Sequence, residues 1–145
     1  MNLLFKKICI SSDHAGYGLK EKIKLNLVKK GVRLIDLGPF EPKSVDYPDY
    51  AKKTARRVAA RKSDAGILIC GSGTGMAISA NKIKGIRAAV CYNTQSTRLS
   101  RQHNNANIIA LGSRLMNKNM VMKLIKIFLN TKFEGGRHLR RIKKI

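Results

Sequence analysis

The feature that most constrains the fold is a continuous apolar run at residues 65–70, followed directly by glycines at 71, 73 and 75. A short run of this kind is typical of a strand buried on both faces of a parallel sheet. Glycines at its end allow a tight turn into the next element. The segment therefore favours an α/β fold in which helices cover both faces of a parallel sheet.

The rest of the chain repeats this alternation. Strand-like apolar segments lie at 8–10, 32–37, 65–70, 86–92 and 107–111. Helical patterns lie at about 19–27, 48–59, 76–82, 94–104 and 117–130. The pattern predicts an α/β Rossmann-like three-layer sandwich, with a five-stranded parallel sheet and helices on both faces. The length of 145 residues predicts one domain over residues 1–145.

Charge is the unusual part of the composition, because 30 Lys and Arg against 8 Asp and Glu give a net charge of +22. Such an excess fits an anionic partner, either a nucleic acid, an acidic membrane surface or a phosphorylated substrate. The basic residues are spread evenly along the chain, which favours solvated lysine-rich faces over a specific nucleic-acid footprint. The composition predicts no specific nucleic-acid partner.

The remaining compositional signals concern metals and location. Three cysteines without metal-binding spacing predict no metal site and a reducing, cytoplasmic setting. The apolar run at 3–5 is too short for a secretion signal. No stretch approaches the 18 apolar residues of a membrane span, so no membrane partner is expected.

The glycine turn has the composition of an anion site. In Cys70-Gly71-Ser72-Gly73-Thr74-Gly75 the glycines let backbone N–H groups approach a ligand, and a helix N-terminus follows. These groups would hold a phosphate or an oxyanion formed during a reaction. The turn lacks the Gly-Lys-Ser/Thr of a P-loop and the later acidic residue of a dinucleotide site. For the glycines alone, an ordinary βα turn is the better interpretation.

Cys70 changes that interpretation because it abuts the glycines. A thiol that faces a helix N-terminus is expected to have thiolate character, which suits a nucleophile or a general base. A lone cysteine is otherwise a small buried hydrophobe, and that is the expectation for Cys9 and Cys91.

Other polar pairs lie at turns where a ligand could bind. In an open parallel sheet, ligands bind beyond the carboxyl ends of the strands. Asp13-His14 and His103-Asn104 are expected among these turns, although a capping Asp and a polar helix end are bland alternatives. Arg137 and Arg141 would project from one face of a helix and could grip a phosphate, unless the tail is disordered.

Together these segments resemble the ribose-5-phosphate isomerase B family, whose blocks occur in the same order over nearly the whole chain. The matching blocks are Ser12-Asp13-His14-Ala15-Gly16, Asp46-Tyr47-Pro48, the 70–75 turn, Ala80-Asn81-Lys82, Gly85-Ile86-Arg87-Ala88, Ser100-Arg101-Gln102-His103-Asn104, Gly112-Ser113-Arg114 and Glu134-Gly135-Gly136-Arg137-His138. Some family members carry a catalytic Glu after the glycines instead of the Cys. Met76 stands there in this chain, which therefore resembles the Cys type.

The resemblance implies a cofactor-free aldose–ketose isomerase that interconverts ribose 5-phosphate and ribulose 5-phosphate in the pentose phosphate pathway. It implies Cys70 as the base that moves a proton between C1 and C2, with help from Ser72. His103 would open the sugar ring. Amides of the turn would stabilise the enediolate, and they belong to Gly71, Gly73, Thr74 and Gly75.

The same resemblance implies the substrate contacts and a second subunit. Asp13 and Asn104 would hold sugar hydroxyls, and Tyr47 would line the site. The phosphate would meet His14, Arg114, Arg137 and Arg141, some of them from a partner. The family implies a homodimer or homotetramer with sites at the interface, and the basic segment 131–145 would reach the partner subunit.

Two alternatives stay open at this stage. A related isomerase for six-carbon sugar phosphates would share the same motif residues. A basic module that binds RNA or DNA would explain the charge, but aromatic residues are only 6% and Trp is absent, so platforms for base stacking are scarce.

Overall fold

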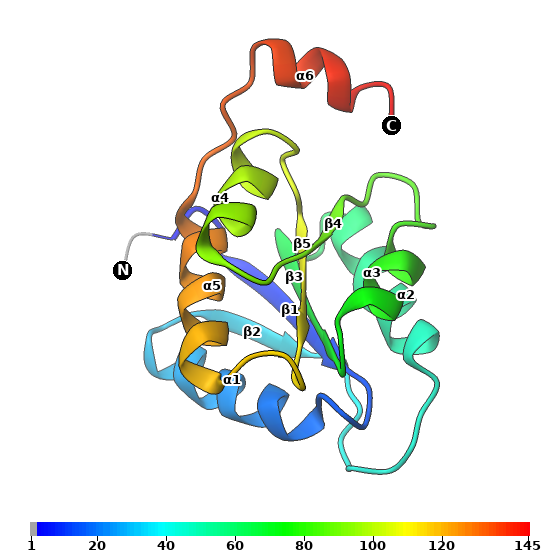
Figure 1. Ribbon diagram of the computed structural model, residues 1–145. Helices are drawn as coiled ribbons and strands as arrows, with labels where there is room; N and C mark the ends of the chain where they lie inside the picture. Colours follow the sequence, from blue (N-terminus) through cyan, green and yellow to red (C-terminus); the bar gives the residue numbers. More distant parts are fainter. Residues whose placement is uncertain (1–2) are drawn as a thin grey trace.

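A computed structural model describes residues 3–145 as a five-stranded, wholly parallel sheet between helices (Figure 1). The order is β2-β1-β3-β5-β4. The strands are β1 (Lys7–Ser12), β2 (Arg33–Asp36), β3 (Ala65–Cys70), β4 (Ala88–Val90) and β5 (Ile108–Gly112). Met1 and Asn2, which precede the short apolar run at 3–5, lie outside the described residues.

The order of the strands places a ligand site at their carboxyl ends. From β1 the chain passes to β2 on one side and then to β3 on the other, so the connections diverge between β1 and β3. Such a divergence leaves a crevice beyond the carboxyl ends of the two strands. In the register of the sheet, Ser12 pairs with Ile69, and Cys70 at the end of β3 pairs with Gly112 of β5.

Helices form a layer on each face of the sheet, which confirms the predicted fold class (Figure 1). The helices α1 (Tyr17–Lys29) and α5 (Lys118–Asn130) cover one face, and α4 (Thr94–Gln102) packs beside α5. The helices α2 (Tyr47–Ala59) and α3 (Thr74–Ala80) cover the other. The last helix, α6 (Arg137–Ile142), stands beyond the amino-terminal ends of the strands.

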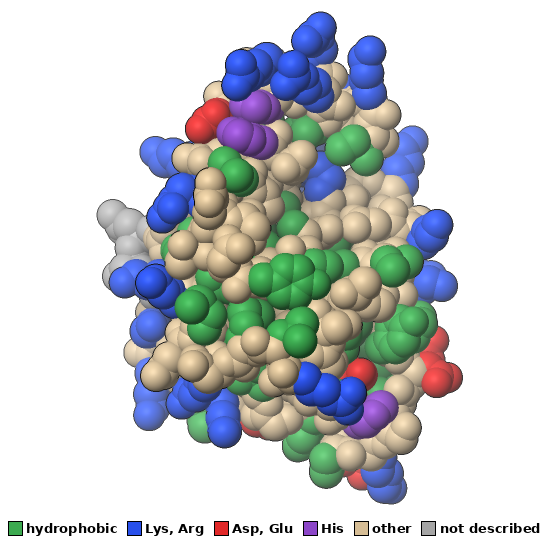
Figure 2. All heavy atoms as spheres, in the orientation of Figure 1, with side chains coloured by type: hydrophobic (Ala, Val, Ile, Leu, Met, Phe, Trp, Pro, Cys, Tyr) green, Lys and Arg blue, Asp and Glu red, His purple; other side chains and the backbone are tan. Residues whose placement is uncertain are grey.

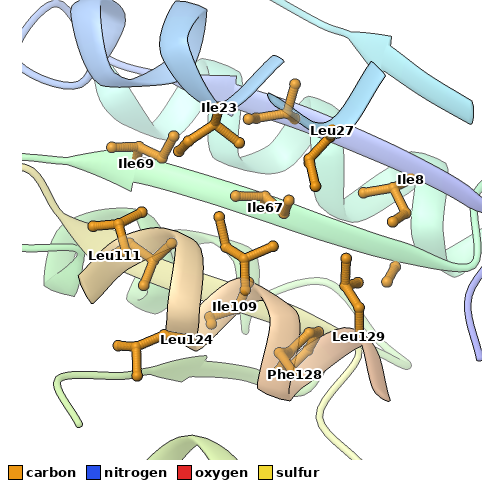
Figure 3. Packing of buried hydrophobic residues seen from close by; sticks show 14 of the residues in the cluster. Ile8, Ile23, Leu27, Ile67, Ile69, Ile109, Leu111, Leu124, Phe128 and Leu129 are labelled. Carbon is orange, nitrogen blue, oxygen red and sulfur yellow. The ribbon is translucent and has the colours of Figure 1, made fainter. Parts of the chain in front are cut away.

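Two apolar clusters hold the layers together. In the larger one, side chains of β3 and β5 pack between α1 and α5 (Figure 3). Ile67 and Phe128 are fully buried there. Burying one such side chain contributes about 1.5–3 kcal/mol. The smaller cluster lies between the sheet and the helices α2 and α3, and it includes Cys70 and Met76. The predicted strand 65–70 is buried along its whole length.

The boundaries differ from the sequence-based expectations in a few places. The helix expected at 76–82 begins two residues earlier, because Gly73 is its N-cap and turns the chain with a φ of +82°. The strand expected at 86–92 is confined to β4, and the Asn81 side chain bonds both the N–H and the carbonyl of Ala88, the first residue of this strand. The expected helix 94–104 ends at Gln102.

A buried lysine ties α1 to β2. The side chain of Lys20 is fully buried, and its Nζ donates to Asp36 Oδ2 over 2.7 Å and to Glu21 Oε1 over 3.0 Å. Lys24 Nζ also lies 2.6 Å from Asp36 Oδ2. Burial raises the pKa of Asp36, but hydrogen bonds from Lys20, Lys24 and the Gly38 N–H outweigh it and lower that pKa below its usual value.

Among the described residues, no helix combines the length and the apolar character needed to cross a bilayer.

Candidate active site

A cavity of about 430 Å³ lies beyond the carboxyl ends of β1 and β3. It brings together seven residues that were singled out in the sequence, far apart along the chain. The lining is formed by Asp13, Tyr47, Cys70, Gly71, Ser72, Gly75, Arg114 and Leu115. Only Leu115 was not anticipated. The cavity therefore unites the turns after β1, β3 and β5 with the first residue of α2.

Cys70 is oriented by the turn that follows it. The residue is only 5% exposed, and the Gly73 N–H donates a hydrogen bond to its Sγ over 3.1 Å. The Ser113 N–H donates to the Cys70 carbonyl over 2.8 Å, which fixes the end of β3 against the turn after β5. A backbone N–H aimed at sulfur is the kind of donor that stabilises a thiolate. The thiol thus has a fixed position at the floor of the cavity.

Two glycines of the turn are required by close packing. A Cβ on Gly73 would lie 3.0 Å from backbone atoms of Leu111, and its φ of +82° is one that L-residues rarely adopt. A Cβ on Gly75 would lie 2.7 Å from the ring of Tyr47. The absence of side chains therefore lets the turn lie against β5 and lets Tyr47 lie over the start of α3.

Arg114 and Asp13 flank the cysteine. The Arg114 backbone N–H donates to the Gly71 carbonyl over 3.1 Å. The Arg114 guanidinium lies over Gly71, so that a Cβ on this glycine would be 3.1 Å from Nη1. Asp13 Oδ1 accepts the Gly16 N–H over 2.9 Å, which holds the carboxylate at the start of α1. The cavity thus combines a cation, an anion and a thiol in its lining.

His14 and Thr74 lie beside the cavity. His14 is exposed, and its Nδ1 accepts the Val45 N–H over 3.4 Å. The Thr74 N–H donates to Ser72 Oγ over 3.2 Å, so the serine hydroxyl is held on the first turn of α3.

The other four predicted residues lie at the opposite end of the sheet. His103 is the C-cap of α4, Asn104 follows it, and Arg137 and Arg141 lie on α6. The expectation that 103–104 belongs with the turns after the strands is wrong, because these residues precede β5. The five residues of β5 separate the two ends by about 16 Å. Figure 2 shows histidine side chains at both ends of the molecule.

At this second end, His103 forms a cluster that spacing in the sequence did not reveal. Its ring stacks on that of His138, with centroids 4.2 Å apart and planes 11° apart. Glu134 Oε2 lies 3.8 Å from His103 Nε2 and 3.6 Å from His138 Nε2. The Glu134 N–H donates to the Gln102 carbonyl over 3.0 Å, which joins the C-terminal segment to the end of α4. The spacing of four residues between Glu134 and His138 indicates this pair, but it does not indicate the contact with His103.

Arg101 anchors the segments that carry this cluster, a role that the sequence pattern does not indicate. It is 4% exposed, and its guanidinium lies 4.8 Å from the Phe5 ring centroid. Its Nε donates to the Thr131 carbonyl over 3.1 Å. Burial, with a contribution from the charge of Arg87, lowers the pKa of Arg101 to about 10. It therefore acts as a structural cation that ties α4 to the segment before α6.

Comparisons with known proteins support the motif resemblance. The ribose/galactose isomerase family model matches residues 8–145. The chain is 45% identical over 140 residues to ribose-5-phosphate isomerase B of Escherichia coli, covering 97% of this chain and 94% of the relative.

Solved structures agree in fold as well as in sequence. A Clostridium thermocellum ribose-5-phosphate isomerase B matches with a TM-score of 0.94 and 48% identity, over 95% of this chain and 93% of that one. The Mycoplasma genitalium enzyme with bound ribulose-5-phosphate matches with a TM-score of 0.92 and 44% identity, over 95% and 92%. The expectation of an isomerase is thereby confirmed at the level of the family: the chain belongs to the ribose/galactose isomerase family.

Proposed function

We propose that the protein interconverts ribose 5-phosphate and ribulose 5-phosphate through a cis-enediolate, as a cytoplasmic enzyme of the pentose phosphate pathway. The observation that carries the proposal is the fixed Cys70 thiol, which faces a cavity with Arg114 and the glycine turn around it. Two relatives support the proposal. The Mycoplasma genitalium enzyme has ribulose-5-phosphate bound, and the Escherichia coli relative is ribose-5-phosphate isomerase B.

The cavity supplies the groups that this proton transfer needs. The Cys70 thiolate removes the proton from C2 of the open-chain aldose, the C–H electron pair forms the C1–C2 double bond, and the π pair of the C1 carbonyl moves onto O1 to give the enediolate. The O2 proton passes to O1, the O2 electron pair forms the C2 carbonyl, and the C1–C2 π pair takes the proton back from the thiol at C1, which gives the ketose without a cofactor. Backbone amides of Gly71 and Gly75 stabilise the oxyanion that develops meanwhile. Asp13 holds sugar hydroxyls and Tyr47 lines the site.

A second copy of the chain completes the site in this proposal. His103 opens the furanose ring and Asn104 holds a hydroxyl, but both lie at the opposite end of their own sheet from Cys70, with the length of β5 between the two ends. A homodimer that joins the Cys70 end of one chain to the His103 end of the other solves this problem. Arg137 and Arg141 then reach the phosphate beside the partner's Arg114. A homotetramer would pair two such dimers.

Exposed apolar side chains support an interface on the face that carries α3 and α4. Ile78, Tyr92 and Leu115 are 58%, 46% and 56% exposed. Figure 2 shows hydrophobic side chains gathered at the centre of the face that Figure 1 presents. Burying such side chains against a partner would add the apolar contact that stable dimers use.

The first test is a coupled assay of ribose 5-phosphate conversion without added metal. We expect activity in the wild type and a loss of about a hundredfold to ten-thousandfold in Cys70→Ala, the range that a general base contributes. Cys91→Ala, which changes a buried cysteine outside the cavity, is the matched control and should stay active. Wild-type activity in Cys70→Ala would refute the assigned base.

Mixing two inactive variants tests the shared site. Cys70→Ala and His103→Gln homodimers should each be inactive. After dissociation and reassociation, half of the dimers contain one chain of each kind, and one of their two sites has both residues intact. About a quarter of the wild-type activity should therefore return. No recovery, with mixed dimers verified by mass spectrometry, would place both residues in one chain's site.

The preference for five-carbon substrates is tested by comparison with a longer sugar. The family model covers isomerases for ribose and galactose derivatives. We expect kcat/KM to be higher for ribose 5-phosphate than for allose 6-phosphate. The reverse order would assign the chain to six-carbon sugar phosphates.

A further inference from the structure

The strongest feature that the isomerase reaction uses only in part is the cluster of His103, Glu134 and His138, of which it uses His103 alone. Each residue offers one ligand atom, and these atoms lie within 4.8 Å of one another. They come from the end of α4, from the linker before α6 and from α6 itself. Proton transfer at the sugar does not require a carboxylate or a second imidazole beside His103.

The distances suit a transition-metal ion after a small contraction. In a tetrahedral zinc site the bonds to nitrogen and oxygen are about 2.0–2.2 Å, so neighbouring ligand atoms lie about 3.4 Å apart. Glu134 Oε2 lies 3.8 and 3.6 Å from the two Nε2 atoms. The imidazole rings must also open from their stacked arrangement for both lone pairs to meet at one ion. The side chain of His103 is 38% exposed, which leaves it room to rotate.

The backbone already holds the three residues together without an ion. The Glu134 N–H bonds to the Gln102 carbonyl, next to His103. Arg101 binds the Thr131 carbonyl on the other side of the linker. A site held in this way loses little conformational entropy when an ion binds.

The surrounding charge selects the kind of ion. Arg137 and Arg141 lie on the same short helix as His138, and the chain carries a net charge of +22. Hard cations such as Mg²⁺ and Ca²⁺ bind through several oxygen ligands, and one carboxylate beside two arginines does not attract them. Two imidazoles and one carboxylate match Zn²⁺ and similar ions, which bind largely through nitrogen lone pairs.

We propose that His103, Glu134 and His138 form an inhibitory binding site for one Zn²⁺-like transition-metal ion per chain. The ion uses the His103 Nε2 lone pair, so the imidazole no longer serves sugar-ring opening while the ion is bound. This inhibitory effect rests on the proposed isomerase function, whereas binding of the ion does not. In this proposal the isomerase reaction uses no metal, and the bound ion is a reversible inhibitor.

The experiment measures binding and activity separately on the full chain after treatment with a chelator. Isothermal titration with ZnCl₂ should give one ion per wild-type chain. Glu134→Gln changes a side chain that is 49% exposed, so it should fold normally and bind at least about tenfold more weakly. His138→Gln should weaken binding to a similar extent. Cys70→Ala should bind like the wild type, and Co²⁺ should give no thiolate charge-transfer band.

The activity arm distinguishes failure of this proposal from failure of the proposed function. Zn²⁺ should inhibit ribose 5-phosphate conversion by the wild type, and a chelator should restore it. Saturable binding in a chain without isomerase activity would support the metal site and refute the proposed function. Isomerase activity without binding, unchanged binding in Glu134→Gln, or loss of binding in Cys70→Ala would overturn the metal site.

Discussion

The backbone N–H of Gly73 lies 3.1 Å from Cys70 Sγ and donates a hydrogen bond to it. Gly73 reaches this position with a φ of +82°, which turns the chain from β3 into α3. The hydrogen bond thus links the backbone conformation of one residue to the chemistry of another.

Gly73→Ala should damage both stability and activity. A left-handed φ costs a residue with a Cβ about 1–2 kcal/mol, and the new Cβ would lie 3.0 Å from the backbone of Leu111. We expect the free energy of unfolding to fall by at least that amount, and kcat to fall more than KM rises. Urea denaturation and steady-state kinetics measure the two effects. Gly18→Ala is the control, because a Cβ there meets nothing within 4 Å. Equal kcat in both variants would separate the turn from catalysis.

Arg114→Lys should weaken substrate binding without removing the base. A lysine keeps the charge but loses the planar fork that binds a phosphate through two hydrogen bonds. We expect KM for ribose 5-phosphate to rise about tenfold, which corresponds to about 1.4 kcal/mol, with a smaller change in kcat. The control is Arg56→Lys on the exposed face of α2. If KM stays at the wild-type value, Arg114 does not bind the phosphate.

Arg101→Met should loosen the second end of the molecule. The change leaves the Thr131 carbonyl without the partner it has in the fold and removes the cation from the Phe5 ring. We expect a loss of about 2 kcal/mol in the free energy of unfolding, together with a lower kcat because the linker that Arg101 holds, and with it Arg137 and Arg141 of α6, shifts relative to His103. Arg98→Met changes an exposed arginine on the same helix and should do neither. A stable variant with normal kcat would show that Arg101 positions nothing.

The Lys20–Asp36 pair should make stability depend on pH in the acid range. A carboxyl group whose folded-state pKa is lowered stabilises the fold above its unfolded pKa of about 3.9, and this contribution is lost as the pH falls through the folded pKa. Asp36→Asn should cost about 3–5 kcal/mol at pH 7, because Lys20 stays buried without its main partner. The difference from the wild type should shrink below about pH 4.

Urea titrations between pH 7 and pH 3 measure this effect. Glu21→Gln is the control, because its carboxylate is 40% exposed and its loss should cost less than about 1 kcal/mol. A difference between wild type and Asp36→Asn that does not change with pH would contradict the role of the ionised carboxylate.

The net charge of +22 should make the encounter with an anionic sugar phosphate depend on salt. A positive field raises the association rate and is screened within about 10 Å at 0.1 M salt. We expect kcat/KM to fall as NaCl rises, with kcat nearly constant. Fluorescence anisotropy with a labelled RNA tests the alternative of a nucleic-acid module. Tight, sequence-dependent RNA binding at physiological salt would favour that alternative.

The fold was predictable because each local signal agreed with the next. The apolar run at 65–70, the helical pattern at 117–130 and the glycines at turns all indicate a parallel sheet with two helical layers. The errors in the prediction concern the ends of helices and strands, where contacts of individual residues matter. The Asn81 side chain bonds Ala88 at the start of β4, and no periodicity in the sequence shows such a contact.

The site was predictable where sequence order and spatial order agree. Asp13 and Cys70 end neighbouring strands, so topology places them together. His103 was placed wrongly because a turn before a strand and a turn after it look alike in a sequence. The cluster around Glu134 depends on how the C-terminal linker lies against α4, and this depends on the buried guanidinium of Arg101. Contacts of this kind between distant segments leave no periodic signal.

The length of β5 has a consequence beyond its own pairing. The first residue of β5 follows the loop that carries His103, and its last residue pairs with Cys70. The length of this strand therefore sets the separation of the two groups of proposed site residues within one chain. In the proposed homodimer, where each site joins the Cys70 end of one chain to the His103 end of the other, any tilt or slip of β5 would change the spacing in both sites at once. In that dimer, fully buried core positions such as Ile109 and Leu111 would affect the alignment of groups on different molecules. Substitutions at these positions are expected to misalign the residues that the two chains contribute to each site. They would therefore lower kcat equally in both sites of the proposed dimer.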